Sequence, residues 1–241
     1  SPFGLGSDIG GSIRIPAFFN GVFGHKPTGG LVPGTGQYPI AENRALRYLS
    51  TGPLARRAED LMPLLRVLAG PDGEDTGCAD LPIGDPATVD VGSLDVIVVE
   101  DNGAKRVSAE LVDALHRAGS ALEAAGARRR TLKIEALRHS FDIWSSMLEA
   151  ESNTPFSQLL GNGRPARAFR ELVKLAVGRS QHTLPGLVLA IIEKLPALTP
   201  GRAKRFIARG HELREELIAL IGDGVLLYPP YPEVPPPPNR P

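Results

Sequence analysis

Glycine and proline interrupt the first 36 residues repeatedly, and this segment limits the possible fold more than any other. Between them stand only short apolar pieces, IRIPAFF at 13–19 and GVFG at 21–24. Glycine reaches backbone conformations that other residues avoid, and proline cannot donate a backbone hydrogen bond. The segment is therefore predicted to form loops around short buried elements.

Later in the chain, short β-branched runs alternate with longer stretches of helical spacing. Buried strands are predicted at 95–100 (DVIVVE) and 225–228, and a further strand at 130–134. Apolar residues at helical spacing predict the following helices: 59–69, 108–126, 137–150, 165–177, 185–195 and 202–221. Strands separated by helices predict an α/β fold with a mixed, partly parallel β-sheet flanked by helices.

No break in charge or composition divides the chain, so 1–241 is predicted to be a single α/β domain. Residues 229–241 hold many prolines and are predicted to be an extended tail that joins neither a sheet interior nor a helix.

Charge and cysteine content exclude several classes of function. The chain of 241 residues has 27 Lys and Arg against 27 Asp and Glu, so its formal net charge is zero and nothing in it favours a nucleic-acid partner. Cys78 is the single cysteine, which excludes an internal disulfide and a tetracysteine zinc site. A reducing, cytoplasmic location is expected.

Gly10-Gly11-Ser12 is the best candidate for chemistry. Glycines before a serine allow successive amides, from Ile9 through Ser12, to point into one concavity and form an anion-binding nest. A serine hydroxyl beside such a nest suits acyl transfer, because the hydroxyl attacks a carbonyl carbon and the N–H groups stabilise the developing oxyanion. A histidine base is not supported by spacing, since none of the five histidines has an evident orienting carboxylate: His25, His116, His139, His182 and His211.

The stretch GLGSDIGGSIRIPAFFNGVFGHKPT, residues 4–28, resembles the core signature of the amidase signature family, whose members use a Ser–Ser–Lys triad. Weaker matches follow at TGPLAR (51–56), VLAGPD (67–72) and VLLYP (225–229). Within the family, the similarity is greatest to amidases of the fatty-acid amide hydrolase type. The resemblance implies the amidase signature fold and hydrolysis of an amide without metal or cofactor.

The resemblance also implies roles for individual residues. Ser12 matches the acylated nucleophile, and the oxyanion-hole amides match Ile9, Gly10, Gly11 and Ser12. Ser7 matches a supporting hydrogen-bonding position, and Asp8 and Arg14 match an ion pair that holds the loop. The bridging serine and the base lysine of the family lie before the position of Ser1. We therefore expect an internal piece of a longer amidase, truncated at both ends and inactive alone.

The expected reaction is hydrolysis of a small-molecule amide, or an ester, through an acyl-enzyme on Ser12. The apolar residues Ile15, Phe18 and Phe19 after the nucleophile favour a hydrophobic acyl group. Membrane contact is not expected, and a homodimer stays open.

Two alternatives remain. One is the amidase subunit of a tRNA-dependent amidotransferase, for which we expect a polar residue in place of Ile15 and which residues 32–39 fit poorly. The other is a catalytically inactive fragment. Glutaminase activity tests the first alternative, and absence of labelling by a serine-directed fluorophosphonate would favour the second.

Overall fold

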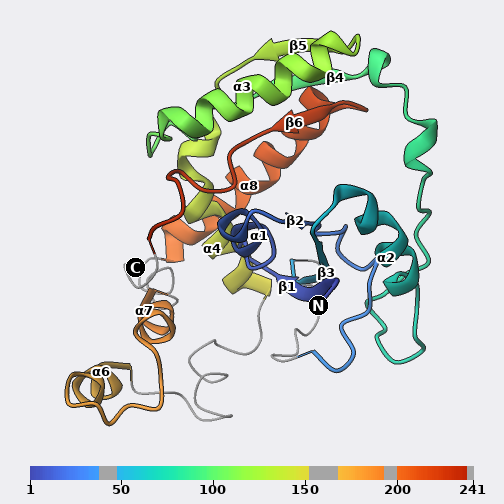
Figure 1. Cartoon of the computed structure of the whole chain (residues 1–241). Helices are drawn as coiled ribbons and strands as arrows, with labels where there is room; N and C mark the ends of the chain where they lie inside the picture. Colours follow the sequence, from blue (N-terminus) through green and yellow to red (C-terminus); the bar gives the residue numbers. More distant parts are fainter. Residues whose placement is uncertain (38–47, 152–167, 193–199, 238–241) are drawn as a thin grey trace. The chain divides into compact units, whose positions relative to one another are not determined.

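The computed structural model describes four stretches of the chain, residues 1–37, 48–151, 168–192 and 200–237 (Figure 1). The chain divides into two compact units. The first comprises Ser1–Thr35, Leu46–Ser140 and Leu213–Pro241, and the second comprises Gly36–Ala45 and Phe141–Glu212. The predicted α/β class is confirmed, because both a parallel sheet and flanking helices are present. The single-domain organisation stays a prediction.

The first unit contains a three-stranded antiparallel sheet of order β1–β3–β2, formed by β1 (Phe3–Asp8), β3 (Ser50–Ala55) and β2 (Phe23–Gly24). Along β1 and β3 the register runs from Phe3 opposite Ala55 to Asp8 opposite Ser50. The sequence did not predict these strands individually, because glycine and proline stand inside them and carry low strand propensity.

A short helix, α1 (Arg14–Asn20), follows β1 after a five-residue loop. Ala17 within the helix and Ile13 directly before it are buried, at 4% and 0% exposure. Phe18 and Phe19 are partly buried, and the Phe19 ring meets the Tyr231 ring edge to face at 5.2 Å. The segment that contains Ser12 is therefore held between a strand and a helix.

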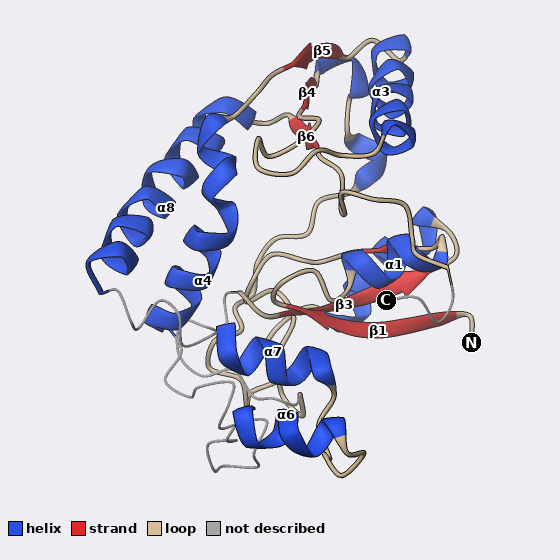
Figure 2. Cartoon of the chain, turned by 90° about the vertical axis from the view of Figure 1, so that its left-hand side faces the viewer, coloured by secondary structure: helices blue, strands red, loops and turns tan. Residues whose placement is uncertain are grey.

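The first unit also contains a three-stranded parallel sheet of order β5–β4–β6 (Figure 2). Its strands are β4 (Asp95–Val98), β5 (Arg128–Thr131) and β6 (Val225–Leu227). All three predicted strands are present, although β5 begins two residues earlier than expected. β4 is buried as predicted, whereas β6 is only partly buried. Helix α3 (Ala109–Ala124) begins after Ser108, as predicted, and connects β4 to β5. Val96 and Val98 of β4 pack with Ala127 in a hydrophobic core, against which Leu115 and Leu122 of α3 also pack.

The remaining predicted helices are also present where the chain is described: α2 (Leu61–Leu68), α4 (Ser140–Glu151), α6 (Ala168–Ala176), α7 (Leu184–Ile192) and α8 (Pro200–Ile221). The predicted helical positions 165–167 and 193–195 lie outside the described residues. Single-turn 3-10 helices occupy Ala58–Asp60, Pro86–Thr88, Val91–Ser93 and Glu135–His139. The proline-rich residues 229–237 contain neither helix nor strand, as expected, and 238–241 lie outside the described part.

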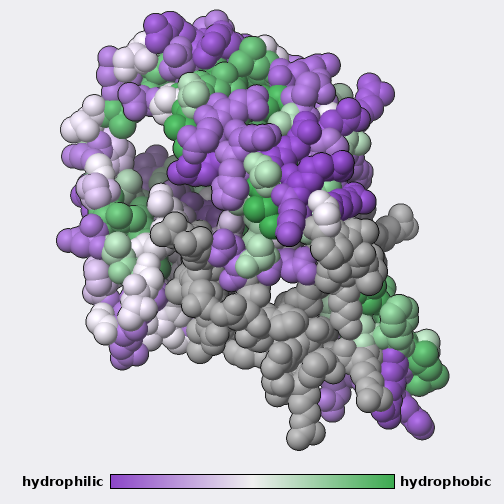
Figure 3. Space-filling view, turned by 180° about the vertical axis from the view of Figure 1, so that it is seen from behind, coloured by the Kyte–Doolittle hydropathy of each residue, from purple (hydrophilic) through white to green (hydrophobic). Residues whose placement is uncertain are grey.

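In the second unit, α6 carries exposed apolar side chains at four-residue spacing, Phe169 and Val173, and Val177 continues the spacing just beyond its end. In the view from behind, green hydrophobic atoms of this region stand at the lower right (Figure 3). None of the described helices combines the length and the apolar character that crossing a membrane requires.

Candidate functional site

Ser12 is exposed and lies on the loop that joins β1 to α1. The ladder between β1 and β3 ends at Asp8, opposite Ser50, and α1 begins at Arg14. Residues 9–12 therefore stand outside the sheet pairing, and their amides are not consumed by a neighbouring strand. Gly10, two residues before the serine, is also exposed, whereas Gly11 between them is buried.

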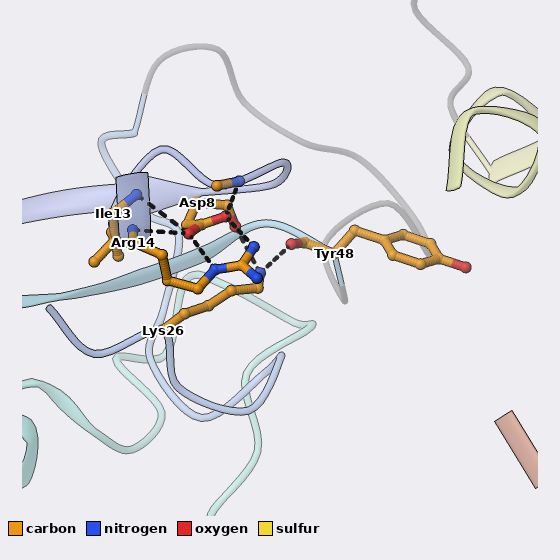
Figure 4. A network of polar contacts seen from close by, with 6 residues as sticks. Asp8, Ile13, Arg14, Lys26 and Tyr48 are labelled. Carbon is orange, nitrogen blue, oxygen red and sulfur yellow. Dashed lines mark hydrogen bonds and ion pairs between the residues drawn. The ribbon is translucent and has the colours of Figure 1, made fainter. Parts of the chain in front are cut away.

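Asp8 is the centre of the polar network beneath the loop (Figure 4). Its carboxylate is fully buried and accepts the N–H groups of Gly11 at 2.6 Å and Ile13 at 3.2 Å. The Arg14 guanidinium completes the network by donating to both carboxylate oxygens, from Nε at 2.9 Å and from Nη2 at 3.0 Å. Ser12 thus lies between two residues whose amides are bonded to one carboxylate.

The charge of Asp8 is stabilised by these donors. Burial alone would raise the pKa of its carboxyl group, but the hydrogen bonds from Arg14, Gly11 and Ile13 lower it further than burial raises it. The pKa of Asp8 consequently lies well below its usual range, and the carboxylate stays ionised at neutral pH. The ion pair that the resemblance implies is present, with the Arg14 side chain half exposed.

Only glycine fits at position 11. Its φ of +118° lies in the region that favours glycine, and a Cβ there would stand 2.6 Å from Cδ1 of Ile15. Its N–H points at Asp8 instead of at an open concavity, which differs from the role that the resemblance implies for this amide.

Among the described residues, no hydrogen bond engages the N–H groups of Gly10 or Ser12. Ile9, the fourth residue of the predicted oxyanion set, has an interaction of its own. Within the described part of the chain, the N–H groups of Gly10 and Ser12 are therefore without a hydrogen-bond acceptor, whereas that of Gly11 is bonded to Asp8.

Ser7 lies in β1, opposite Thr51 and partly buried, one residue before the carboxylate. The structure brings Ser7, Asp8 and the Ser12 loop to the same end of the first sheet. Ser50, across the ladder from Asp8, is buried, and its hydroxyl has no hydrogen-bond partner within the described chain.

Lys26 is a member of the network that the sequence did not indicate as part of the site. Its Nζ donates to the carbonyl oxygen of Asp8 at 2.7 Å and to that of Tyr48 at 2.6 Å (Figure 4). Burial lowers the pKa of the Lys26 ammonium, and the negative charge of Asp8 opposes that effect. Both acceptors are main-chain carbonyls, so no residue type at position 8 or 48 could have signalled the contact.

His116 corrects one expectation. Its Nε2 lies 2.8 Å from Oε1 of Glu100, so one histidine does have a carboxylate partner, although none was evident from the sequence. Its other ring nitrogen, Nδ1, contacts the Arg129 guanidinium. Because both ring nitrogens are engaged, this imidazole has no free acceptor for a serine proton. No group of three or more metal-ligating side chains occurs in the stretches that the structure describes.

Comparison with known protein families identifies the family of this chain. The family described as Amidase matches residues 1–236. The chain belongs to the amidase signature family.

Among curated relatives of this amidase chain, human fatty-acid amide hydrolase 2 is 38% identical over 248 residues, which cover 98% of the chain and 45% of the relative. The A subunit of the mitochondrial glutamyl-tRNA(Gln) amidotransferase of Ornithorhynchus anatinus is 36% identical over 150 residues, covering 61% of the chain and 28% of the relative. The chain thus spans a little under half of the length of the human relative.

A solved structure supports the fold of the amidase chain. The A subunit of glutamyl-tRNA(Gln) amidotransferase from Thermotoga maritima superposes with a TM-score of 0.63 at 21% identity, over 91% of this chain and 45% of that protein. At this identity the comparison supports only the fold, and the superposition agrees with the predicted amidase signature fold.

Proposed function

We propose that the protein that carries this chain hydrolyses a small-molecule carboxylic amide through an acyl-enzyme on Ser12. The observation that carries the proposal is the exposed Ser12 between the tethered amides of Gly11 and Ile13, with the Gly10 and Ser12 N–H groups unengaged. Family membership and the 38% identity to human fatty-acid amide hydrolase 2 support it.

In the proposed reaction, the Ser12 hydroxyl adds to the carbonyl carbon while a base takes its proton. The former carbonyl oxygen becomes an oxyanion, and the N–H groups of Gly10 and Ser12 donate to it. The C–N bond then breaks and the amine leaves with a proton, which gives an ester on Ser12. Water hydrolyses the ester and releases the carboxylic acid.

The base belongs to the Ser–Ser–Lys triad that the family resemblance implies. Two cationic side chains of the described network do not suit this role. Arg14 is always protonated, and Lys26 directs its Nζ at two main-chain carbonyl oxygens and makes no hydrogen bond to Ser12 within the described residues. A lysine acting as base needs a pKa close to neutral and a lone pair directed at the serine system.

A hydrophobic acyl group is part of the proposal. Ile15 lies directly under Gly11, and the rings of Phe18 and Phe19 are 5.7 Å apart on α1. These apolar side chains follow the nucleophile at once, and the human relative is named for fatty-acid amides. We further propose that the reaction takes place in the cytoplasm, because a single cysteine suits a reducing compartment.

The test is hydrolysis by the native protein, expressed from its full coding sequence. A long-chain acyl amide, a short-chain acyl amide and glutamine serve as substrates. The long-chain amide is expected to be hydrolysed fastest, and Ser12→Ala is expected to abolish hydrolysis. Ser93→Ala, in the exposed 3-10 helix Val91–Ser93 outside the site, is the matched control and should retain wild-type rates. Unchanged hydrolysis by Ser12→Ala would refute the proposal.

The second candidate function is that of an amidotransferase amidase subunit, favoured by the 36% identity to the A subunit of the Ornithorhynchus anatinus enzyme. That similarity covers 61% of the chain, against 98% for the human hydrolase. The apolar Ile15 also differs from the polar residue that we expect in such a protein. Glutamine as the preferred substrate, with activity rising on addition of a partner subunit, would establish this alternative.

A further inference from the structure

The segment around Lys26 is fixed to β3 on both sides of the lysine. The His25 N–H donates to the carbonyl of Pro53 at 3.0 Å. A Cβ on Gly52 would lie 2.1 Å from the His25 carbonyl oxygen and 2.8 Å from Cδ of Pro27, so only glycine permits this approach. The Lys26 backbone therefore has a defined position and direction before its side chain makes any contact.

From this position, the Lys26 ammonium joins three segments that are distant in sequence. It donates to the carbonyl of Asp8, the last residue of β1, and to the carbonyl of Tyr48, two residues before β3 begins. Both distances, 2.7 Å and 2.6 Å, are those of charge-assisted hydrogen bonds. An ammonium has three donors and no acceptor, so two protons are used here in a strong, directional contact.

Asp8 transmits this constraint to the nucleophile. Its carbonyl is held by Lys26, while its carboxylate holds the N–H groups of Gly11 and Ile13. Ser12 stands between those two amides. A shift of the Asp8 backbone must therefore carry the carboxylate with it and move both neighbours of the serine.

We propose that Lys26 is a positioning residue for Ser12. By anchoring the Asp8 main chain, Lys26 fixes the position and orientation of the loop that carries the nucleophile. This inference rests on the proposed function, since it gives Lys26 a role in the reaction of Ser12. It differs from the role of a base, because the Lys26 Nζ is directed at two main-chain carbonyls and makes no hydrogen bond to Ser12 within the described residues. A guanidinium can replace it as an anchor, whereas a guanidinium cannot act as a base.

The experiment measures the rate at which a fluorophosphonate labels Ser12 in the native protein, followed by intact mass. The variants are Lys26→Met, which removes the donors, and Lys26→Arg, which keeps the charge and several donors. Lys133→Met removes an exposed lysine and is the matched control. We expect labelling of Lys26→Met to slow about 10²-fold, as for a misplacement of about 1 Å, and Lys26→Arg to recover most of the rate.

Amide hydrogen exchange separates local displacement from general instability. In Lys26→Met, the amides of Gly11 and Ile13 should exchange faster, while those of Val96 and Val98 in the parallel sheet should keep wild-type protection. Faster exchange at all four positions would mean a global loss of stability and would overturn the positioning role. If Lys26→Met does not fold, Lys26→Gln is measured by the same two assays. It keeps one donor group, so slowed labelling supports the inference and the wild-type rate contradicts it.

The outcomes distinguish this inference from the proposed function. Labelled wild-type protein together with a Lys26→Met variant that labels at the same rate would overturn the positioning role and leave the proposed function intact. Failure of Lys26→Arg to recover any rate would also overturn it and would point to a lysine-specific proton transfer. No labelling of wild-type Ser12 would remove the proposed function and this inference together.

Discussion

Replacement of Asp8 by asparagine should destabilise the first unit strongly, because the carboxylate is the acceptor for three neighbouring residues. Asparagine keeps one acceptor oxygen and places an NH₂ group where the second oxygen was. In one orientation, that NH₂ group faces the Gly11 N–H and Nη2 of Arg14. In the other, it faces the Ile13 N–H and Nε of Arg14. Donors therefore face a donor in both orientations. The variant therefore loses the ion pair and leaves at least one buried N–H without an acceptor.

The magnitude follows from burial. Removing one partner of a buried ion pair costs about 3–5 kcal/mol. The Asp8 side chain is fully buried, but that of Arg14 is 50% exposed and regains water when the pair is broken. We therefore expect the lower end of that range, about 3 kcal/mol of unfolding free energy.

The assay is equilibrium denaturation in urea, with Asp95→Asn as control. Asp95 pairs with Arg128 at the similar distance of 3.0 Å, but both side chains are substantially exposed, at 36% and 73%. The control should lose less than about 1 kcal/mol, as surface pairs do. Equal losses for the two variants would refute the argument that burial makes the Asp8 network strong.

The same network predicts a pH dependence. Because the pKa of Asp8 is lower in the folded state than in the unfolded state, its stabilisation is fully present above about pH 4 and is lost as pH falls further. The difference in unfolding free energy between wild type and Asp8→Asn should therefore shrink as acid is added below pH 4. A difference that stays constant down to pH 2 would contradict the assignment of the charge to Asp8.

Three further predictions concern single positions. Gly52→Ala places a Cβ against the His25 carbonyl and should cost about 3 kcal/mol, measured by denaturation; a loss under about 0.5 kcal/mol would contradict the close approach. Gly11→Ala forces an unfavourable φ and a clash with Ile15, so it should cost about 1–3 kcal/mol and slow fluorophosphonate labelling at least tenfold; wild-type labelling would contradict this role of the glycine. His116→Gln should leave labelling within twofold of wild type, because both ring nitrogens are already engaged; a loss of labelling would show that this histidine takes part in catalysis.

The sequence predicted the two sheets unequally, for physical reasons. The parallel sheet is built on DVIVVE, whose β-branched side chains are buried on both faces and give a local signal. The antiparallel sheet includes Gly4, Gly6, Gly52 and Pro53, which are unfavourable in strands by propensity. Buried Ile13 lies against Gly6 of β1, and Ile13 and Ala17 lie against Gly24 of β2. These tertiary contacts favour the strands and have no local sequence pattern.

The candidate site shows the same difference. Gly10-Gly11-Ser12 suggested a nucleophile loop from residue chemistry alone, and the family resemblance supplied the Asp8–Arg14 pair. Lys26 was missed as part of the site because its partners are main-chain carbonyls, which every residue type carries. The carboxylate partner of His116 was missed because Glu100 is 16 residues away, and only the fold brings the two together.

The most direct test of the account is to identify the residue that becomes acylated. The native protein is treated with a fluorophosphonate, digested and analysed by mass spectrometry, with Ser12→Ala treated in parallel. We predict one modified peptide, which carries the adduct on Ser12 and is absent from the variant. An adduct on another serine that persists in Ser12→Ala would contradict the claim that the loop between β1 and α1 presents the nucleophile.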